Sequence, residues 1–241
     1  SCIDCGIKAG EWITETKWKK SNSPQDLEYE KTFWPFILIS KKRYTGDKYE
    51  FDHIKPKERT SMGIVMKRRD NAPIVKYVFG NVIEIIMKDK SVEKAIEWLG
   101  TCLQQIKDGG MDETMFIITK SLSAYYKNPE GIAHKVLADR MAERNPGNKP
   151  KPNDRIPFMY QKVNEEPIKV GMFKNGKPKF KKRKILQGDR VEHPDFIKEN
   201  NIPIDYNFYI SNQIMKPVKQ VLDLRSEEHT SELQSPMYLV C

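Results

Sequence analysis

The stretch Lys41-Lys42-Arg43-Tyr44-Thr45-Gly46 is a short basic cluster that ends in an aromatic residue and is closed by a glycine. It follows a strand-like apolar run from Phe33 to Ile39, which we expect to have a buried centre. Tyr44 to Phe51 alternates enough to form the antiparallel partner strand. Cations at the end of a strand can be directed toward phosphates while the sheet holds them in place. Basic tetrapeptides are common, so the meaning of this cluster depends on the segments around it.

The surrounding segments occur in a characteristic order. Leu27-Glu28-Tyr29-Glu30-Lys31 and Pro35-Phe36-Ile37-Leu38 precede the cluster, and Gly63-Ile64 and Arg68-Arg69-Asp70-Asn71-Ala72-Pro73 follow it. This series resembles the end of the palm and the start of the thumb of family B replicative DNA polymerases, in particular those of eukaryotes and large DNA viruses. Further segments with the same resemblance are Thr119 to Leu122, Asp154 to Pro157 and Gly188 to Glu192. The resemblance spans nearly all of residues 1–224.

The resemblance implies an α+β chain with two parts: the C-terminal part of an antiparallel-sheet palm over 1–66 and a mainly helical thumb over 67–224. The residue patterns agree with this division. Apolar residues with a helical period predict helices over 3–20, around Val75 to Ile86, from Val92 to Ile106, from Asn128-Pro129 to Met141, and from Tyr206 to Leu222. Short strands are predicted over 114–119 and 155–163, and Asn175-Gly176 predicts a hairpin turn.

By resemblance, Lys41, Lys42, Arg43 and Tyr44 hold the primer strand near its 3′ end. Cations suit this task because they neutralise the DNA backbone without reading its sequence. The other residues expected to contact phosphates are Arg68, Arg69, Lys120 and Arg190, together with Lys181, Lys182 and Arg183 of a basic loop over 177–184. We expect Asp189 to orient Arg190.

The chain also departs from the family pattern. Nucleotide transfer needs acidic residues that hold two Mg²⁺ ions, and this family places them near Asp-Thr-Asp-Ser and Ser-Leu-Tyr-Pro-Ser elements. Neither element occurs in the chain, and neither does any Asp-x-Asp spacing. We therefore expect a C-terminal slice of a polymerase that is inactive alone. The expected partners are primer–template DNA and, for the parent enzyme, deoxynucleotides, Mg²⁺ and a processivity clamp.

Composition supports a polyanionic partner. The 241 residues include 42 Lys and Arg against 33 Asp and Glu, a formal net charge of +9. No apolar run of membrane-spanning length occurs, so no membrane partner is expected. The four cysteines suggest no disulfide framework. A reducing compartment is therefore expected, and the resemblance implies a nucleus or a cytoplasmic viral replication site and not secretion.

Two alternatives compete with the polymerase fragment. The first is a non-enzymatic nucleic-acid-binding module anchored by the basic loop, which charge alone does not exclude. The second is a zinc module built on Cys2 and Cys5, but the sequence supplies no second ligand pair at a suitable spacing. The four histidines are scattered and are expected to serve packing or surface roles: His53, His134, His193 and His229.

The C-terminal residues 225–241 begin Arg-Ser-Glu-Glu-His-Thr-Ser-Glu-Leu-Gln-Ser. This string resembles the translation of a common sequencing adapter. The helical pattern that leads up to Leu224 stops at Arg225 without a capping Gly or Asn. We therefore expect residues 225–241 to have no evolved function and to pack on nothing.

Overall fold

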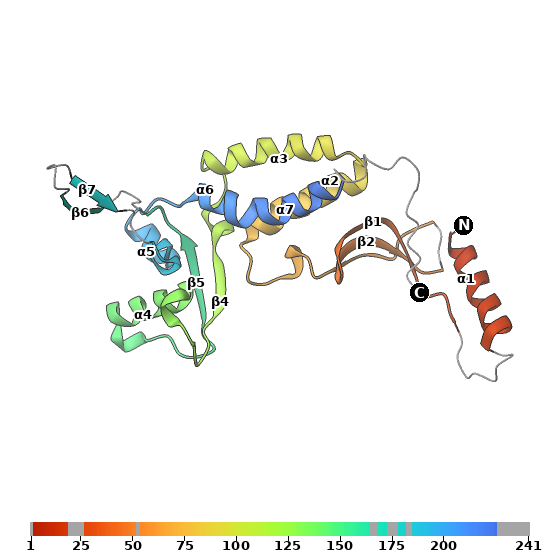
Figure 1. Cartoon of the computed structure of the whole chain (residues 1–241), viewed down its shortest axis with the longest axis horizontal. Coiled ribbons are helices and arrows are strands. Elements are labelled where there is room, and N and C mark those ends of the chain that lie inside the picture. Colours follow the sequence, from red (N-terminus) through yellow and green to blue (C-terminus); the bar gives the residue numbers. More distant parts are fainter. Residues whose placement is uncertain are drawn as a thin grey trace. The chain divides into compact units, whose positions relative to one another are not determined.

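The computed structural model of the chain describes residues 2–18, 27–51, 54–163, 168–172, 178–181 and 185–225. These residues form two compact units (Figure 1). The first unit contains residues 2–68, Ile83–Val92 and 219–225, and the second contains Arg69–Val82 and Glu93–Val218. The boundary predicted between residues 66 and 67 divides a palm from a thumb, whereas the two units are defined by contacts within the chain. The palm–thumb boundary stays a prediction. The expectation for the tail 226–241 lies outside the described residues.

The first unit is built on a three-stranded antiparallel sheet in the order β1-β2-β3. Its strands are β1 (Thr32–Ser40), β2 (Arg43–Tyr49) and β3 (Glu58–Met62). The antiparallel partner strand predicted from Tyr44 to Phe51 is present as β2, although it begins at Arg43 and ends at Tyr49. β1 lies at the edge of this sheet and is bulged between Phe33 and Phe36, on either side of Pro35, which cannot donate a ladder hydrogen bond.

The expected buried centre of β1 is wrong. Trp34 is 61% exposed and Leu38 is 44% exposed, so this strand is only half-covered. An apolar run does not distinguish a strand with two covered faces from a strand that stays partly open.

Helices complete the first unit. The predicted N-terminal helix is present as α1 (Cys2–Ile13), which continues into a π-helical segment, η1 (Thr14–Trp18). A 3-10 turn, η3 (Val65–Lys67), follows the sheet. The long helix α2 (Pro73–Asp89) ends in this unit, where its Glu84 contacts Arg59 of β3, and Arg59 also donates to Asp47 of β2 at 2.7 Å. These ion pairs tie β2 and β3 to the end of α2.

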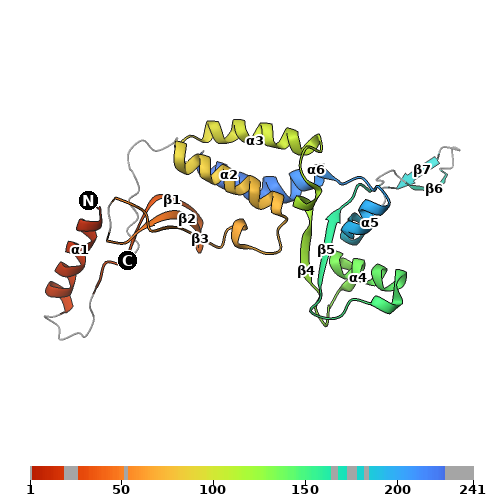
Figure 2. The same ribbon diagram turned by 180° about the vertical axis from the view of Figure 1, so that it is seen from behind.

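The second unit has two halves. In the first half, α3 (Val92–Lys107) runs beside α2 (Figures 1 and 2), and the rings of Tyr77 and Trp98 lie 6.1 Å apart. The predicted helical periods are confirmed here, because the residues on them are buried: Val75, Val78, Val82, Ala95, Leu99 and Ile106. Ile96, which shares the helical period of these apolar residues in α3, is 52% exposed.

The other half contains a second antiparallel sheet, with strands in the order β4-β5-β8. They are β4 (Ile118–Ser121), β5 (Arg155–Tyr160) and β8 (Val191–Glu192). A separate antiparallel pair is formed by β6 (Ile168–Met172) and β7 (Pro178–Lys181). The turn predicted at Asn175-Gly176 lies between these strands in the sequence but outside the described residues. The strand predicted over 114–119 is partly wrong, because a 3-10 turn, η4 (Glu113–Phe116), precedes β4.

Helix α4 (Ala133–Arg144) covers this second sheet together with α5 (Pro194–Glu199) (Figure 1). Asn128 does not cap α4 as predicted. Pro129 starts a separate 3-10 turn, η5 (Pro129–Gly131), and α4 begins after Ile132 without a side-chain cap. Two more 3-10 turns follow along the chain, η6 (Pro146–Asn148) and η7 (Gln187–Arg190).

The predicted last helix consists of three segments: α6 (Tyr206–Phe208), a π-helical η8 (Tyr209–Ile214) and α7 (Met215–Leu222), before a final 3-10 turn, η9 (Asp223–Arg225). Pro217 has no N–H to donate to an earlier turn, and the helix widens just before it. The antiparallel sheets and helices make the chain α+β, as predicted. Among the described residues, none of the helices is long and apolar enough to cross a membrane.

Candidate nucleic-acid interface

The basic cluster forms the turn between β1 and β2. Lys41 and Lys42 are the two turn residues, and Lys42 has a positive φ of 62°. Both side chains are exposed, and within the described part of the chain neither one forms an ion pair with a carboxylate. The two ammonium groups are therefore available to an external anion.

Gly63 holds this turn from the end of β3. Its φ is +62°, and a Cβ atom added to it would lie 2.2 Å from the carbonyl oxygen of Lys42. Both the backbone conformation and the close approach require a residue without a side chain. The turn is thus fixed by backbone packing and does not depend on the lysine side chains.

Arg43 and Tyr44 have a different role from the lysines. The Arg43 guanidinium donates to the side-chain oxygen of Gln220 at 2.9 Å. The Tyr44 ring packs 5.8 Å from Phe33 and 5.5 Å from Phe36. These half-buried side chains anchor β2 within the first unit, and the neighbouring lysines carry the accessible charge.

A second group of cations lines a cavity of about 400 Å³ that lies entirely in the second unit. Arg69 comes from the segment before α2, Lys120 from β4 and Arg155 from β5. The cavity is completed by Asp70, Thr119, Ser121 and His134. The structure thus brings together two predicted residues, Arg69 and Lys120, and adds Arg155 and His134, which sequence reasoning did not select.

His134 is the lining residue of this cavity whose ordinary pKa lies nearest neutral pH. Burial lowers the pKa of His134, and the positive charge of Lys120 lowers it further, while a hydrogen bond with the Ser121 backbone acts in the opposite direction. Its Nε2 lies 3.0 Å from the hydroxyl of Tyr126, which also accepts a hydrogen bond from the backbone N–H of Ser123. A half-buried imidazole held in this way is expected to be neutral at neutral pH.

Arg190 is not part of the cavity lining. Its guanidinium lies 3.9 Å from the carboxylate of Asp205 and 5.3 Å from the centre of the Phe208 ring. Asp189 accepts a hydrogen bond from the backbone N–H of Leu186 at 2.9 Å. The prediction that Asp189 orients Arg190 is therefore wrong, because Asp189 is engaged by its own turn and Asp205 is the nearby carboxylate.

Of the remaining predicted residues, the structure describes the side chain of Arg68 alone, and Arg68 does not line the cavity. Arg68 is exposed at the end of the first unit, where its backbone N–H closes the turn η3. Lys182 and Arg183 lie outside the described residues, as does the side chain of Lys181.

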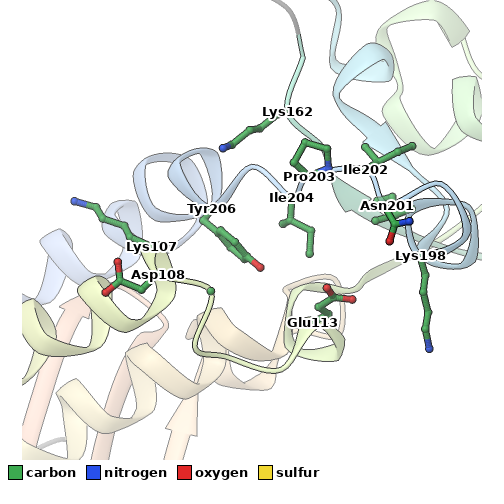
Figure 3. A pocket seen from close by; sticks show the side chains of 12 residues that line it. Lys107, Asp108, Glu113, Lys162, Lys198, Asn201, Ile202, Pro203, Ile204 and Tyr206 are labelled. Carbon is green, nitrogen blue, oxygen red and sulfur yellow. The ribbon is translucent and has the colours of Figure 1, made fainter.

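Another cavity of about 390 Å³ in the second unit carries charges of both signs (Figure 3). Lys107, Lys162 and Lys198 line it together with Asp108 and Glu113. The ring of Tyr206 points toward Glu113, and burial together with that carboxylate raises the pKa of Tyr206. Because the lysines of this cavity share it with two carboxylates, it is a weaker candidate for binding a polyanion.

No metal centre is evident in the part of the chain that the structure describes, because no three His, Cys, Asp or Glu residues are grouped as ligands. Cys2 and Cys5 are exposed on α1 and belong to no such group. The zinc alternative therefore finds no support among the described residues.

Comparisons with known proteins agree on one family. Residues 2–224 match the family model described as DNA polymerase family B. The chain is 46% identical over 222 residues to a DNA polymerase of Pyramimonas orientalis virus, and this alignment covers 92% of the chain and 17% of the viral protein. It is 49% identical over 201 residues to a DNA polymerase of Acanthamoeba polyphaga mimivirus, covering 83% of the chain and 11% of that protein.

A cellular relative and a solved structure extend the comparison. The DNA polymerase delta catalytic subunit of Candida albicans is 31% identical over 238 residues, which cover 97% of the chain and 20% of that subunit. The family B DNA polymerase of the hyperthermophilic archaeon Pyrobaculum calidifontis aligns with a TM-score of 0.57 and 18% identity, covering 89% of the chain and 24% of the archaeal protein. This last match supports the fold. The chain spans a fifth or less of the length of these three sequence relatives.

Proposed function

The chain belongs to DNA polymerase family B, and from this we propose that it is the part of a DNA-directed DNA polymerase that holds the primer–template duplex. Residues 1–66 would supply the end of the palm and residues 67–224 the thumb. The family match over residues 2–224 favours this function over an independent nucleic-acid-binding module.

The observation that carries the proposal is the presentation of Lys41 and Lys42. Two exposed ammonium groups lie next to each other on a turn that Gly63 fixes, and within the described residues no carboxylate pairs with them. Phosphates are the anions that such a pair can contact without reading a base sequence. A polymerase needs that property, because it must hold any primer–template.

The chemical step belongs to other parts of the parent enzyme. Bound Mg²⁺ ions would activate the primer 3′ hydroxyl and stabilise the charge that develops on the incoming deoxynucleotide. The residues described here do not fit such ions, since they contain no cluster of metal ligands. We assign the metal ligands and the nucleotide site to the parent outside this chain, and a processivity clamp as a further partner of the parent.

Binding of the chain to duplex DNA tests the proposal. We expect salt-sensitive binding with a Kd of roughly 10⁻⁴–10⁻⁶ M, the range of non-specific binding. The double variant Lys41→Ala/Lys42→Ala should weaken binding equally on several duplex sequences. It should also reduce the slope of log Kd against log salt by about one unit for each lost contact. Fluorescence anisotropy at several salt concentrations measures both quantities.

The matched control is Lys8→Ala/Lys55→Ala, which removes two exposed lysines of the same unit from other places. It should leave the affinity and the salt slope close to those of the unchanged chain. If both double variants weakened DNA binding equally, Lys41 and Lys42 would contribute only through the net charge of the chain. That result would contradict the proposed contact.

A further inference from the structure

We propose that the cavity formed by Arg69, Lys120, His134 and Arg155 binds one phosphate of the DNA backbone, and that His134 takes up a proton when the phosphate enters. This inference rests on the proposed function and adds a specific site to it. The site differs from the basic turn in position, since all of its residues belong to the second unit.

The charge of the cavity favours an anion. Arg69, Lys120 and Arg155 each contribute a cation, and Asp70 is the single carboxylate residue among those that line it. Within the described ranges, none of the three cations forms an ion pair with a carboxylate. The cavity around Tyr206 offers a contrast, since its three lysines share the space with Asp108 and Glu113. A surplus of cations in one concave site concentrates the field on a bound anion.

The backbone holds these side chains in place. Lys120 pairs with Ile156 across β4 and β5, and Ser121 pairs with Arg155. The guanidinium of Arg155 donates to the carbonyl oxygen of Thr119 at 3.3 Å, which directs it along β4. Beyond the strand ends, the backbone N–H of Leu122 donates to the carbonyl of Asp154 at 2.8 Å. A site carried by paired strands loses little freedom when a ligand binds.

His134 responds to the charge in the cavity. Without an anion, burial and the ammonium of Lys120 disfavour the charged imidazolium, so the pKa of His134 is lowered. A phosphate between these groups would add negative charge and favour the imidazolium. The hydroxyl of Tyr126, 3.0 Å from Nε2, is positioned to accept a hydrogen bond from the charged ring.

The charged and titratable groups around His134 come from several elements. Lys120 on β4 opposes its protonation. Arg155 on β5, Arg69 before α2 and Asp70 line the same cavity. Tyr126, in the loop that precedes α4, supplies a neutral hydroxyl. The cations outnumber the carboxylate, and an anionic ligand would therefore change the balance at His134 most strongly.

The position of His134 in this cationic cavity determines how phosphate binding and protonation of His134 affect each other. Binding of phosphate raises the pKa of His134, so binding is accompanied by proton uptake. Affinity should then increase as the pH falls through the pKa of the complex, and it should level off below the pKa of the empty cavity. The empty cavity holds the pKa of His134 below the ordinary imidazole value of about 6.5, so the affinity should level off only at a pH below that value.

The test measures binding of a short DNA duplex to the full chain at about pH 6 and about pH 8. We expect severalfold tighter binding at the lower pH, with an upper limit of about tenfold per pH unit for one linked proton. His134→Gln, which keeps a hydrogen-bonding group for Tyr126, should lose this pH dependence. His193→Gln, a matched change at the histidine that caps α5, should keep it. Lys120→Ala should weaken binding at both pH values, and Lys198→Ala, which removes a lysine from the mixed cavity, should not.

A second measurement stays informative if a variant fails to fold. The pKa of His134 in the unchanged chain is followed by NMR during titration with inorganic phosphate and, separately, with the duplex. A rise with both ligands supports the site, and a rise with free phosphate alone would show an anion site that the DNA backbone does not reach, which overturns the proposal.

The two proposals fail in different ways. If the chain binds duplex DNA through Lys41 and Lys42 but the His134→Gln variant keeps the full pH dependence, the phosphate site is wrong and the proposed function stands. If no duplex binding occurs at any pH or salt concentration, the proposed function fails, and the phosphate site fails with it.

Discussion

A Cβ atom on Gly63 would lie 2.2 Å from the carbonyl oxygen of Lys42, so the chain leaving β3 closes directly against the turn that carries Lys41 and Lys42. The two residues also share a left-handed backbone conformation, with φ of +62° at each. The position of the two ammonium groups therefore depends on a residue that carries no charge.

Gly63→Ala should destabilise the chain and displace the turn. An alanine there is strained by the positive φ and collides with the Lys42 carbonyl, and we expect a loss of about 2 kcal/mol in the free energy of unfolding. Urea unfolding measures this loss. The control is Gly100→Ala in α3, where a Cβ meets nothing within 4 Å. That change should stabilise the chain by about 0.5–1 kcal/mol. Equal stability of the Gly63→Ala variant and the unchanged chain would contradict the packing seen here.

Glu192→Gln should remove a buried charge that α4 compensates. Glu192 is 2% exposed, and its carboxylate accepts hydrogen bonds from Arg144 at 3.0 and 2.9 Å and from the backbone N–H of His193 at 2.9 Å. We expect the free energy of unfolding to fall by about 2 kcal/mol near neutral pH. This is less than the usual cost of breaking a buried ion pair, because Arg144 reaches solvent. Glu143→Gln, an exposed change on the same helix, should have little effect.

The same residue predicts a pH dependence. Burial by itself raises the pKa of Glu192, but the hydrogen bonds from Arg144 and His193 and the charges of Arg140 and Arg144 outweigh burial and lower it. The stabilising contribution is therefore complete above the ordinary Glu pKa of about 4.3 and is lost as the pH falls through the lowered pKa of the folded state. The stability difference between the unchanged chain and Glu192→Gln should narrow in that acidic range. A difference that stays constant down to the acid unfolding transition would contradict the lowered pKa.

Tyr209→Phe should loosen the second unit without changing its charge. The buried Tyr209 hydroxyl donates to the carbonyl oxygen of Phe116 at 2.6 Å and accepts from the backbone N–H of Tyr160 at 3.0 Å. Without it, two buried backbone groups lose a partner, and we expect a cost of about 2 kcal/mol in thermal or urea unfolding. Tyr77→Phe, at a ring that is 44% exposed, serves as the control and should be nearly neutral. If Tyr77→Phe lowered the free energy of unfolding as much as Tyr209→Phe, the loss would come from replacing tyrosine in general. It would then not come from the buried hydrogen bonds of Tyr209.

The chain as given should bind duplex DNA but should not extend a primer. Its sequence lacks any Asp-x-Asp spacing, and its described residues contain no group of metal ligands. Positioning a duplex does not replace two aligned Mg²⁺ ions. A primer-extension assay with Mg²⁺ and deoxynucleotides measures this, with an intact family B polymerase as the positive control. Template-dependent extension that persists through further purification would show that this chain contains a catalytic carboxylate pair.

Local patterns along the chain were sufficient for several elements. The helical period around Val78 and Val82 predicts α2, because one face of a helix must be apolar to be buried. The pair Asn175-Gly176, whose backbone preferences favour a hairpin turn, lies in the sequence between β6 and β7, and these two strands pair antiparallel. The order of the short segments from Leu27 to Pro73 was sufficient to indicate the family. Each of these inferences depends on residues that are neighbours in the sequence.

The contacts between charged residues that are far apart in the sequence depend on the tertiary structure. The pairing of β4 with β5 brings Lys120 and Arg155 to one cavity. Helix α4 adds His134, for which the sequence predicts only a packing or surface role. Arg190 lies by Asp205 instead of its neighbour Asp189, because Asp189 caps its own turn. Register and packing set these contacts, and no local preference encodes them. The sequence alone therefore determines the family and most helices, whereas the fold determines where its cations gather, since electrostatic interactions depend on distance in space.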